Sequence, residues 1–362
     1  MSRRLLVAAG GTGGHIFPGI AVAEKLKQLG WEVSWVGTED RMEAQVVPSH
    51  GFEIDFIKVK GLRGNGLKRL LKAPFMILKA IIAARNILKT HKPDAVLTMG
   101  GYVTGPVGIA AKMLGVPLII HEQNAVAGFS NKLLAKLATR VLCAFQGAFA
   151  DRACDIVGNP IRDSVTQIQS KSITHQVNCL VVGGSLGAKA LNDTLPDVFS
   201  SLNEKNHASL AVWHQSGKGN GGGVTKRYEG QSFDYKVTEF IENMDQAYEW
   251  ADIIVCRAGA LTVSEVAAAG KMAVFVPLPH AVDDHQTLNA RALVDKQAAL
   301  IVPQSELNMS NMVSLLEPFF AEPHLIEEKA LRAKACAQLD ATNSVVEIIK
   351  EVTNQRESCE RK

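Results

Sequence analysis

The sequence has no uninterrupted run of 18 apolar residues, so we expect no segment that crosses a bilayer. The opening residues, MSRRLLVAAGG, hold an apolar stretch too short for a signal peptide or a membrane helix. The six cysteines include no CxxC pair and match no zinc-site spacing. We therefore expect reduced thiols, most of them buried, as is usual in cytosolic proteins.

Acidic residues are absent between Asp55 and Asp94, a stretch that carries ten lysines and arginines. Because the chain has a formal net charge of +3, the remainder carries −7. A local basic field of this kind attracts an anionic partner. Within it, residues 67–82 (LKRLLKAPFMILKAII) are apolar on nearly all sides, with a basic flank. They predict an amphipathic element on an anionic lipid surface or, alternatively, a core helix with a solvated basic face.

The length of 362 residues, with 47% hydrophobic and 21% charged, indicates two globular domains. Apolar runs typical of buried strands alternate with helical patterns, which predicts an α/β fold with doubly wound parallel sheets. In the first half we expect strands at 4–9, 32–36, 54–59, 95–98 and 117–120, and helices at 17–29, 67–88 and 103–114. The pattern restarts with strands at 177–182, 209–214, 253–256 and 272–276 and a helix at 189–202.

These patterns place one domain at residues 1–160 and the other at 161–340, with a hinge at 157–162 that contains GNP. We expect the tail, 341–362, to be a charged helix that joins the first domain. The glycine-rich stretch 217–223 (GKGNGGG) is expected to be a flexible loop.

A glycine-rich loop, GGTGGH at 10–15, lies between the first strand and its helix. Glycines allow the backbone to approach a ligand, and a helix N-terminus attracts phosphate. The loop is neither a Walker loop nor a complete GxGxxG. His15, at the helix start, is a candidate general base or else a structural histidine. A second loop, 100–105 (GGYVTG), also follows a strand, and the pair predicts a diphosphate ligand at the carboxyl edge of the sheet. The alternative for both loops is a structural tight turn.

Three further polar segments follow strands. His121, Glu122, Gln123 and Asn124 are costly to bury without a function and could hydrogen-bond a sugar. The loop GGSLGA at 183–188 suits another phosphate, with Ser185 as a ligand. The segment CRAGALTVSE at 256–265 offers Arg257 to a diphosphate and Glu265 to ribose hydroxyls. Four residues could be read as a metal cluster, but their spacing matches no established site, so we predict no metal: His280, Asp283, Asp284 and His285.

The motifs GGTGGHIFPG, TMGGYVTGP, HEQNAVAG, GNPIR, GGSLGA and CRAGALTVSE, in this order, resemble the MurG family. The resemblance covers essentially the whole chain. It implies a GT-B fold, with two Rossmann-like domains facing across a cleft. It also implies inverting transfer of N-acetylglucosamine from UDP-N-acetylglucosamine to the C4 hydroxyl of undecaprenyl-pyrophosphoryl-N-acetylmuramyl-pentapeptide, without a cofactor. The implied location is the cytoplasmic face of the bacterial inner membrane, with the basic segment 67–82 on the lipid surface.

The resemblance also assigns residues to substrates. Those implied to bind UDP-N-acetylglucosamine are Thr12, Gly13, Gly14, Asn124, Arg162, Ser185, Ile241, Ala260, Leu261, Thr262, Val263, Ser264, Glu265 and Gln286, beside Arg257 from the charge argument. Those implied near the acceptor are Gly100, Gly101, Tyr102, His121, Glu122 and Asn131. As the base that removes the acceptor proton we predict His15, with Glu122 second.

Two other functions fit parts of the sequence. A nicotinamide-dependent oxidoreductase would use the first loop and an acid near the second strand, Glu39 or Asp40. It leaves the second set of loops unexplained. A binding module for lipid or nucleic acid would use the basic segment alone and leaves the same loops without a purpose. We therefore predict no nucleic-acid partner.

Overall fold

The computed structural model describes the chain except residues 1, 60–66, 174–175, 206–207, 280–283 and 361–362, and except the side chains of 67–73, 357, 359 and 360. It divides into two compact units. Unit 1 comprises Met1–Arg162 with Gln338–Lys362, and unit 2 comprises Asp163–Ala337. The divisions therefore fall after Arg162 and Ala337, where the sequence analysis places them after 160 and 340.

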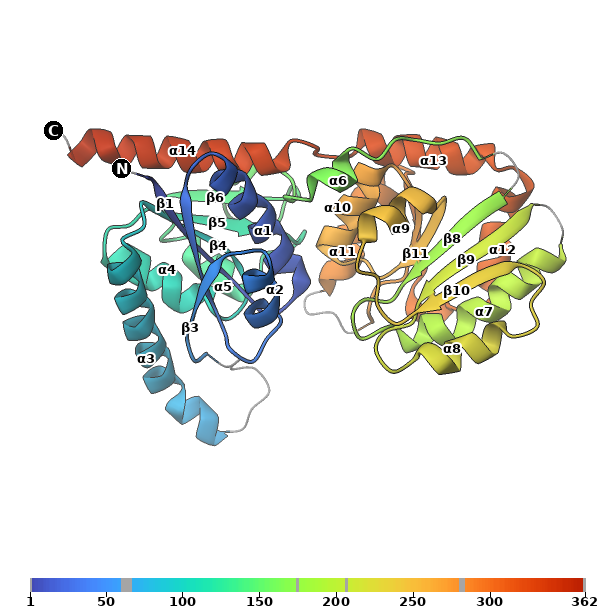
Figure 1. The fold of residues 1–362 in the computed structure, drawn as a ribbon, viewed down its shortest axis with the longest axis horizontal. Coiled ribbons are helices and arrows are strands. Elements are labelled where there is room, and N and C mark those ends of the chain that lie inside the picture. The colour runs from blue at the N-terminus through green and yellow to red at the C-terminus, as the bar shows by residue number, and fades with distance from the viewer. Residues whose placement is uncertain (1, 60–66, 174–175, 206–207, 280–283, 361–362) are drawn as a thin grey trace. The chain divides into compact units, whose positions relative to one another are not determined.

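Unit 1 is built on a parallel sheet with strand order β3-β2-β1-β4-β5-β6-β7 (Figure 1). The order reverses between β1 and β4, which pair directly, with Leu5 opposite Ala95. Such a reversal sends the helices that follow the two strands to opposite faces of the sheet and creates the usual ligand position of doubly wound folds. The strands are β1 (Arg4–Ala9), β2 (Glu32–Gly37), β3 (Glu53–Phe56), β4 (Ala95–Gly100), β5 (Leu118–Glu122), β6 (Arg140–Cys143) and β7 (Asp155–Ile156).

Helices cover both faces of this sheet. Successive side chains of a strand point to opposite faces, so each strand contributes to two apolar clusters. On β1, Leu5 and Val7 join one apolar cluster with α1 (Gly13–Gln28) and α14 (Ala341–Glu360). Leu6, between them, joins the cluster on the other face. That face is covered by α3 (Leu67–His91), α4 (Thr104–Met113) and α5 (Phe129–Leu134), while α2 (Glu43–Ser49) lies beside β2 and β3.

Unit 2 repeats the same plan with strand order β10-β9-β8-β11-β12-β13, all parallel. Here the order reverses between β8 and β11. The strands are β8 (Gln176–Val182), β9 (Ser209–Gln215), β10 (Asp234–Thr238), β11 (Ile253–Cys256), β12 (Met272–Phe275) and β13 (Ala299–Ile301). The helices are α6 (Asp163–Thr166), α7 (Lys189–Glu204), α8 (Gly221–Tyr228), α9 (Met244–Trp250), α10 (Ala260–Ala269), α11 (His285–Val294), α12 (Met309–Ala321) and α13 (His324–Ala335), with the 3-10 turn η2 (Gln304–Glu306).

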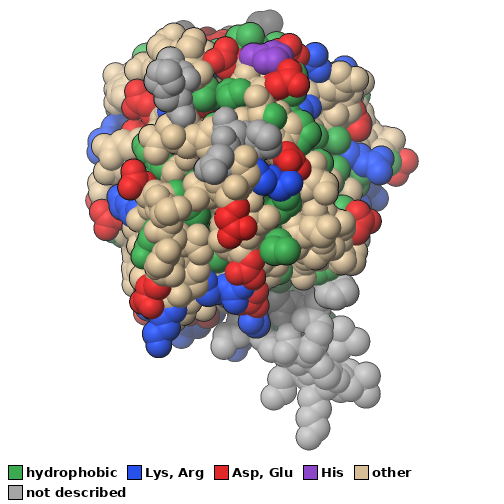
Figure 2. Space-filling model, turned by 90° about the vertical axis from the view of Figure 1, so that its right-hand side faces the viewer, with side chains coloured by type: hydrophobic (Ala, Val, Ile, Leu, Met, Phe, Trp, Pro, Cys, Tyr) green, Lys and Arg blue, Asp and Glu red, His purple; other side chains and the backbone are tan. Residues whose placement is uncertain are grey.

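Surface charges of both signs are interspersed on the face shown in Figure 2. In unit 2, opposite charges also form ion pairs, as between Arg227 and Asp197 (2.7 Å) and between Lys205 and Glu317 (2.8 Å). A nucleic-acid-binding surface instead concentrates positive charge in one stripe. Positive charge is not gathered into such a stripe on this face.

The predicted strands and helices are present, but two local expectations were wrong. Helix α1 begins at Gly13, four residues before the predicted start, so the glycine loop already forms its first turn. The stretch 217–223 is not loop throughout, since α8 begins at Gly221. Val224 and Tyr228, one turn apart, are both buried. Their packing outweighs the low helix propensity of the three glycines before them.

The expectation that all cysteines are reduced thiols was also wrong. Cys143 and Cys154 form a disulfide, with Cα atoms 6.1 Å apart. Cys143 ends β6 and Cys154 directly precedes β7, the strand that pairs with β6, so the topology brings the two together. Cys179 and Cys256 are free and buried, and burial raises the pKa of Cys256 to about 12.

Candidate active site

In unit 1, the loops after β1 and β4 touch at the point where the strand order reverses. The amide of Gly10 donates to the carbonyl of Gly100 at 3.3 Å. A Cβ on Gly101 would lie 2.3 Å from the Gly10 oxygen, and the φ of Gly101 is +91°. Both the contact and the backbone conformation require glycine. The structure thus joins the first two predicted loops into one surface, beside which Tyr102 is 57% exposed.

A buried carboxylate that the sequence analysis missed holds the first loop. Glu43 is fully buried and accepts hydrogen bonds from the amide of Gly11 (2.9 Å) and from the amide and hydroxyl of Thr38 (3.0 and 2.7 Å). Glu39 and Asp40, the acids considered for a nicotinamide ribose, are exposed. The buried acid near this strand, Glu43, is thus already hydrogen-bonded to backbone and side-chain groups of the same unit. This weakens the hypothesis of a nicotinamide-dependent oxidoreductase.

His15 is the third residue of α1 and is half-buried. Its Nδ1 lies 2.9 Å from Oε1 of Gln123. The amide nitrogen of Gln123 lies 3.1 Å from Nδ1 of His121, whose Nε2 lies 2.9 Å from the carbonyl oxygen of Gly158. His121 is fully buried, and burial lowers its pKa to about 4, so its ring is neutral near pH 7. The two loops and the HEQN segment therefore meet at His15.

Glu122 has a different environment from His15. Its carboxylate is buried and accepts from the amides of Asn124 (3.0 Å) and Gly128 (3.0 Å) and from the side chains of Asn124 (3.2 Å) and Asn131 (2.9 Å). Both oxygens are occupied in holding the loop that leads to α5. This geometry favours His15 over Glu122 as the base.

Burial also changes the expected roles of two residues assigned to the acceptor. His121 is fully buried with both ring nitrogens engaged, and Asn131 is 3% exposed with its amide on Glu122 and on the His121 carbonyl. Direct contact with an acceptor does not fit these positions. Each instead supports a neighbour, since the Asn131 amide donates to Glu122 and the His121 ring contacts Gln123.

On the other side of His15, Thr12 is the exposed residue before α1, and Gly13 and Gly14 form its first turn. The carbonyl of Thr12 accepts from the amide of His15 at 3.1 Å, which ties the base candidate to the loop. The guanidinium of Arg162 stacks on Phe17 of the same helix, 5.1 Å from the ring centre.

In unit 2, the loop 183–188 follows β8 and is held by a glutamine. Oε1 of Gln215 accepts from the amides of Gly183 and Gly184, both at 3.1 Å, and its amide donates to the carbonyls of Gly184 and Glu239. A Cβ on Gly217 would lie 2.2 Å from the nitrogen of Gly187. Ser185 is exposed at the loop tip. Gln215 thus holds the start of the loop, while Ser185 at its tip is exposed.

The second predicted donor segment follows β11, the strand beside β8. Gly259 is extended, and α10 begins at Ala260, so the helix N-terminus lies at the same sheet edge as the loop 183–188. Glu265 is 5% exposed, and the hydroxyl of Tyr248 donates to its Oε2 at 3.0 Å. Ala260 and Val263 are buried, while Leu261, Thr262 and Ser264 are half-buried.

The comparisons with known proteins agree with this geometry. Residues 5–143 match the glycosyltransferase family 28 N-terminal domain, and residues 178–352 match the glycosyltransferase family 28 C-terminal domain. The chain belongs to glycosyltransferase family 28. The resemblance seen in the motifs is confirmed. The loops 10–15 and 100–105 lie within the residues matched by the N-terminal domain, and the loops 183–188 and 256–265 lie within those matched by the C-terminal domain.

Two relatives of this family 28 chain carry the same name, UDP-N-acetylglucosamine–N-acetylmuramyl-(pentapeptide) pyrophosphoryl-undecaprenol N-acetylglucosamine transferase. The one from Pseudoalteromonas translucida (strain TAC 125) is 60% identical over 98% of this chain and 100% of its own length. The one from Shewanella amazonensis is 50% identical over 97% of this chain and 98% of its own.

Among solved structures, Acinetobacter baumannii MurG superposes with a TM-score of 0.84 and 42% identity, covering 96% of this chain and 99% of that one. A calicheamicin glycosyltransferase, 14% identical with a TM-score of 0.69 over 98% and 99% of the two chains, shares the fold. The predicted GT-B class, with two Rossmann-like domains, is confirmed.

Within this family 28 chain, Arg257 has contacts that the sequence analysis did not foresee. Its guanidinium donates to the carbonyls of Val276 (2.9 Å) and Pro277 (3.2 Å) and to Oε1 of Gln304 (2.6 Å). These bonds account for its position without a diphosphate, so its ligand role stays a prediction. Oε1 of Gln286 similarly accepts from the amide of Leu278 (2.9 Å). Ile241 is 5% exposed.

The alternative of a metal cluster at residues 280–285 gains no support from the residues that the structure describes. No group of three or more His, Cys, Asp or Glu side chains there could hold an ion. His280 and Asp283 lie outside the described residues, and Asp284 is exposed and accepts from the hydroxyl of Thr287 at 2.7 Å.

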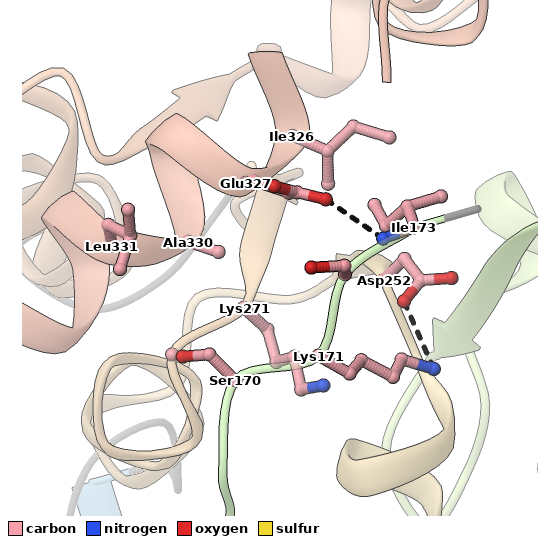
Figure 3. Close-up of a pocket in the computed structure, with 11 residues that line it drawn as sticks. Ser170, Lys171, Ile173, Asp252, Lys271, Ile326, Glu327, Ala330 and Leu331 are labelled. Atoms are coloured by element: carbon pink, nitrogen blue, oxygen red, sulfur yellow. Dashed lines mark hydrogen bonds and ion pairs between the residues drawn. The ribbon is translucent and has the colours of Figure 1, made fainter. Parts of the chain in front are cut away.

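A pocket of about 130 Å³ in unit 2, drawn in Figure 3, lies at the amino ends of the strands, whereas the donor segments lie at their carboxyl ends. Asp252 and Lys271, which line it, directly precede β11 and β12, whereas the donor segments follow the strands. Lys171 pairs with Asp252 at 3.0 Å, and the amide of Ile173 donates to Glu327 at 2.8 Å. Burial lowers the pKa of Lys271 to about 8. Because its lining residues precede the strands, this pocket is separate from the candidate site, which is built from segments that follow them.

Proposed function

We propose that this chain transfers N-acetylglucosamine from UDP-N-acetylglucosamine to the C4 hydroxyl of undecaprenyl-pyrophosphoryl-N-acetylmuramyl-pentapeptide, with inversion at the anomeric carbon. The observation that carries the proposal is the pair of loop sites at the strand-order reversals. One is formed after β1 and β4 with His15, the other after β8 and β11 with Glu265. The names of the relatives support the donor and the acceptor.

The proposed reaction is one in-line displacement. His15 removes the proton of the acceptor hydroxyl while its oxygen attacks the anomeric carbon, and UDP leaves from the opposite face. The leaving diphosphate gains negative charge. Backbone amides at the tip of the loop 183–188, beyond the two that donate to Gln215, and at the start of α10 are expected to provide donors that require no reorganisation as that charge develops.

Glu265 is expected to bind the donor ribose, and Glu265→Gln should weaken UDP-N-acetylglucosamine binding about 10- to 100-fold, since hydrogen bonds to a charged group are worth roughly 1.5–3 kcal/mol. Tyr248→Phe, which removes only the hydroxyl that supports Glu265, is the matched control and should have a smaller effect. Calorimetric titration measures both. A donor affinity unchanged in Glu265→Gln would contradict the ribose assignment.

The proposed function itself is tested by donor binding and by turnover. We expect UDP-N-acetylglucosamine to bind in preference to UDP-N-acetylgalactosamine, with and without EDTA, and a lipid-linked acceptor to be glycosylated. NADH is expected not to bind. Tight NADH binding, or no binding of any UDP-sugar, would return the chain to another reaction class.

We also propose that this enzyme works as a peripheral protein at the cytoplasmic face of the bacterial inner membrane, through α3. No helix among the described residues is long and apolar enough to cross a membrane. Along α3, Phe75 is 73% exposed, Leu78 54% and Ile82 51%, and the exposed Lys79 lies between them. Exposed apolar side chains beside lysine are typical of a surface that lies in a lipid headgroup region. Lys68, Arg69 and Lys72, also in the predicted segment, have side chains outside the described residues.

Replacing two of these side chains should separate lipid binding from folding. The double variant Phe75→Ser/Leu78→Ser is expected to lose at least about tenfold in affinity for vesicles that contain anionic lipid, because about 1.5–3 kcal/mol of apolar burial is removed per side chain. Its melting temperature should stay unchanged, since both side chains are exposed. Leu331→Ser, at a residue 61% exposed in unit 2, is the matched control in a vesicle sedimentation assay. Equal binding by all three proteins would refute the role of α3.

A further inference from the structure

A chain of hydrogen bonds links His15 to a backbone carbonyl in the interior of unit 1. It runs from Gly158 through His121 and Gln123 to Nδ1 of His15. Its inner end is a carbonyl oxygen, which can only accept. His121 must therefore carry its proton on Nε2, and as a neutral ring it presents a lone pair at Nδ1. The direction of every other bond in the chain follows from this end.

The orientation of the Gln123 amide is fixed by two acceptors on one side. Its nitrogen lies 3.1 Å from Nδ1 of His121 and 3.3 Å from the main-chain oxygen of His121. A flipped amide would place its oxygen against both of these acceptors and leave buried lone pairs facing one another. Oε1 of Gln123 therefore faces His15, and because it can only accept, His15 must donate Nδ1–H to it at 2.9 Å.

The GNP turn (158–160) holds the inner end and the middle of this series of hydrogen bonds in place. Gly158 has a φ of +83°, and a Cβ there would lie 2.4 Å from Cβ of Gln338. Asn159, 2% exposed, donates from its amide to the main-chain oxygen of Gln123 at 3.2 Å. The turn therefore does more than separate two elements of the polypeptide. It supplies the carbonyl that polarises the hydrogen bonds and the donor that anchors Gln123.

We propose that Gln123 is a positioning residue that fixes His15 in the tautomer with the proton on Nδ1, so that Nε2 keeps its lone pair for the acceptor hydroxyl. The inference rests on the proposed function in taking His15 as the base. As the new C–O bond forms, the hydroxyl proton passes to Nε2 and the bond between the anomeric carbon and UDP breaks, its electron pair leaving with UDP. The imidazolium that results still donates Nδ1–H to Oε1 of Gln123, which stabilises its charge.

The same geometry assigns His121 a supporting role without proton transfer. The Gln123 amide does not relay a proton from its oxygen to its nitrogen. His121 is already neutral, and its one ring N–H donates to the Gly158 carbonyl. The proton that His15 takes up must therefore leave again from Nε2. His121 contributes by orienting Gln123.

The test reads the tautomer of His15 directly in the free protein, by long-range 15N–1H correlation spectra with 15N-histidine labelling. The His15 signals are identified by their loss in His15→Gln. Gln123→Met keeps the length of the side chain but removes both the donor and the acceptor. Gln123→Glu keeps an acceptor toward His15 and loses the donor toward His121. Gln215→Met, which removes the loop-holding glutamine of unit 2, is the matched control for losing such an amide.

In the wild type we expect Nδ1–H with an unprotonated Nε2, and in Gln123→Met a shift toward the other tautomer. Turnover in Gln123→Met should fall about 10- to 100-fold in kcat with an unchanged KM for UDP-N-acetylglucosamine. Gln123→Glu should keep the wild-type tautomer, because it retains the acceptor toward His15, and Gln215→Met should leave the His15 signals unchanged.

Two results would overturn the inference. One is a wild-type His15 protonated on Nε2, and the other is an unchanged tautomer in Gln123→Met. If the tautomer responds as expected but His15→Ala turns over normally, the positioning by Gln123 stands and the role of His15 as the base fails, so the two proposals are distinguishable.

Discussion

His15→Ala is expected to lower kcat about 10²- to 10⁴-fold, the usual contribution of a general base, while the KM for UDP-N-acetylglucosamine stays within a few-fold of the wild type. Most of the residues assigned to the donor lie in unit 2, chiefly after β8 and β11, whereas His15 lies in unit 1. Removal of the imidazole should therefore affect the attack by the acceptor and leave ground-state donor binding largely intact. Steady-state kinetics with a lipid-linked acceptor analogue measure both constants.

The control for this variant is His50→Ala. His50 is a histidine of the same unit whose imidazole Nδ1 lies 2.8 Å from Oε1 of Glu24, and it lies outside the candidate site. Its replacement should leave kcat within twofold of the wild type. If His15→Ala kept a wild-type kcat at a wild-type melting temperature, another group would have to remove the proton. Glu122 would then return as the candidate, despite the four hydrogen bonds on its carboxylate.

Two substitutions in the glycine-rich stretch 217–223 should have opposite effects on stability. Gly217→Ala places a Cβ 2.2 Å from the nitrogen and 2.3 Å from the Cα of Gly187, at a φ of +84°. Backbone atoms cannot move aside as a side chain can, so we expect a loss of about 2–4 kcal/mol in the free energy of unfolding. Because the loop 183–188 is displaced by the same clash, donor affinity should fall at least about tenfold.

Gly222→Ala is the matched change five residues later. Gly222 lies inside α8 with nothing within 4 Å of the added Cβ. Alanine should stabilise the helix by about 0.5–1 kcal/mol and leave donor affinity unchanged. Thermal unfolding and donor titration of the two variants test the pair. A Gly217→Ala protein as stable as the wild type would mean that the two loops do not approach as closely as the structure has them.

The sequence by itself determined the fold class, most strand positions and the places of the glycine-rich loops. Buried parallel strands need long apolar runs, and their turns to helices need glycine, so both leave local signals such as 4–9 and GGTGGH. Six motifs in order were enough to indicate the family before any contact was known. Edge strand β10, with exposed Asp234, Tyr235 and Lys236, carries no such run and was not predicted.

Only the tertiary structure decided what the polar residues near the loops do. Glu43, Gln123 and Gln215 are ordinary in the sequence, yet each is buried and holds glycine amides or a histidine from a distant segment. His121, assigned to the acceptor from its motif, lies inside the unit, and Cys143 meets Cys154 because β6 pairs with β7. A motif records which residue types are present. Which side chain reaches a ligand and which one supports it depends on burial and on partners 32 to 108 residues away, and these exist only once the strands have paired.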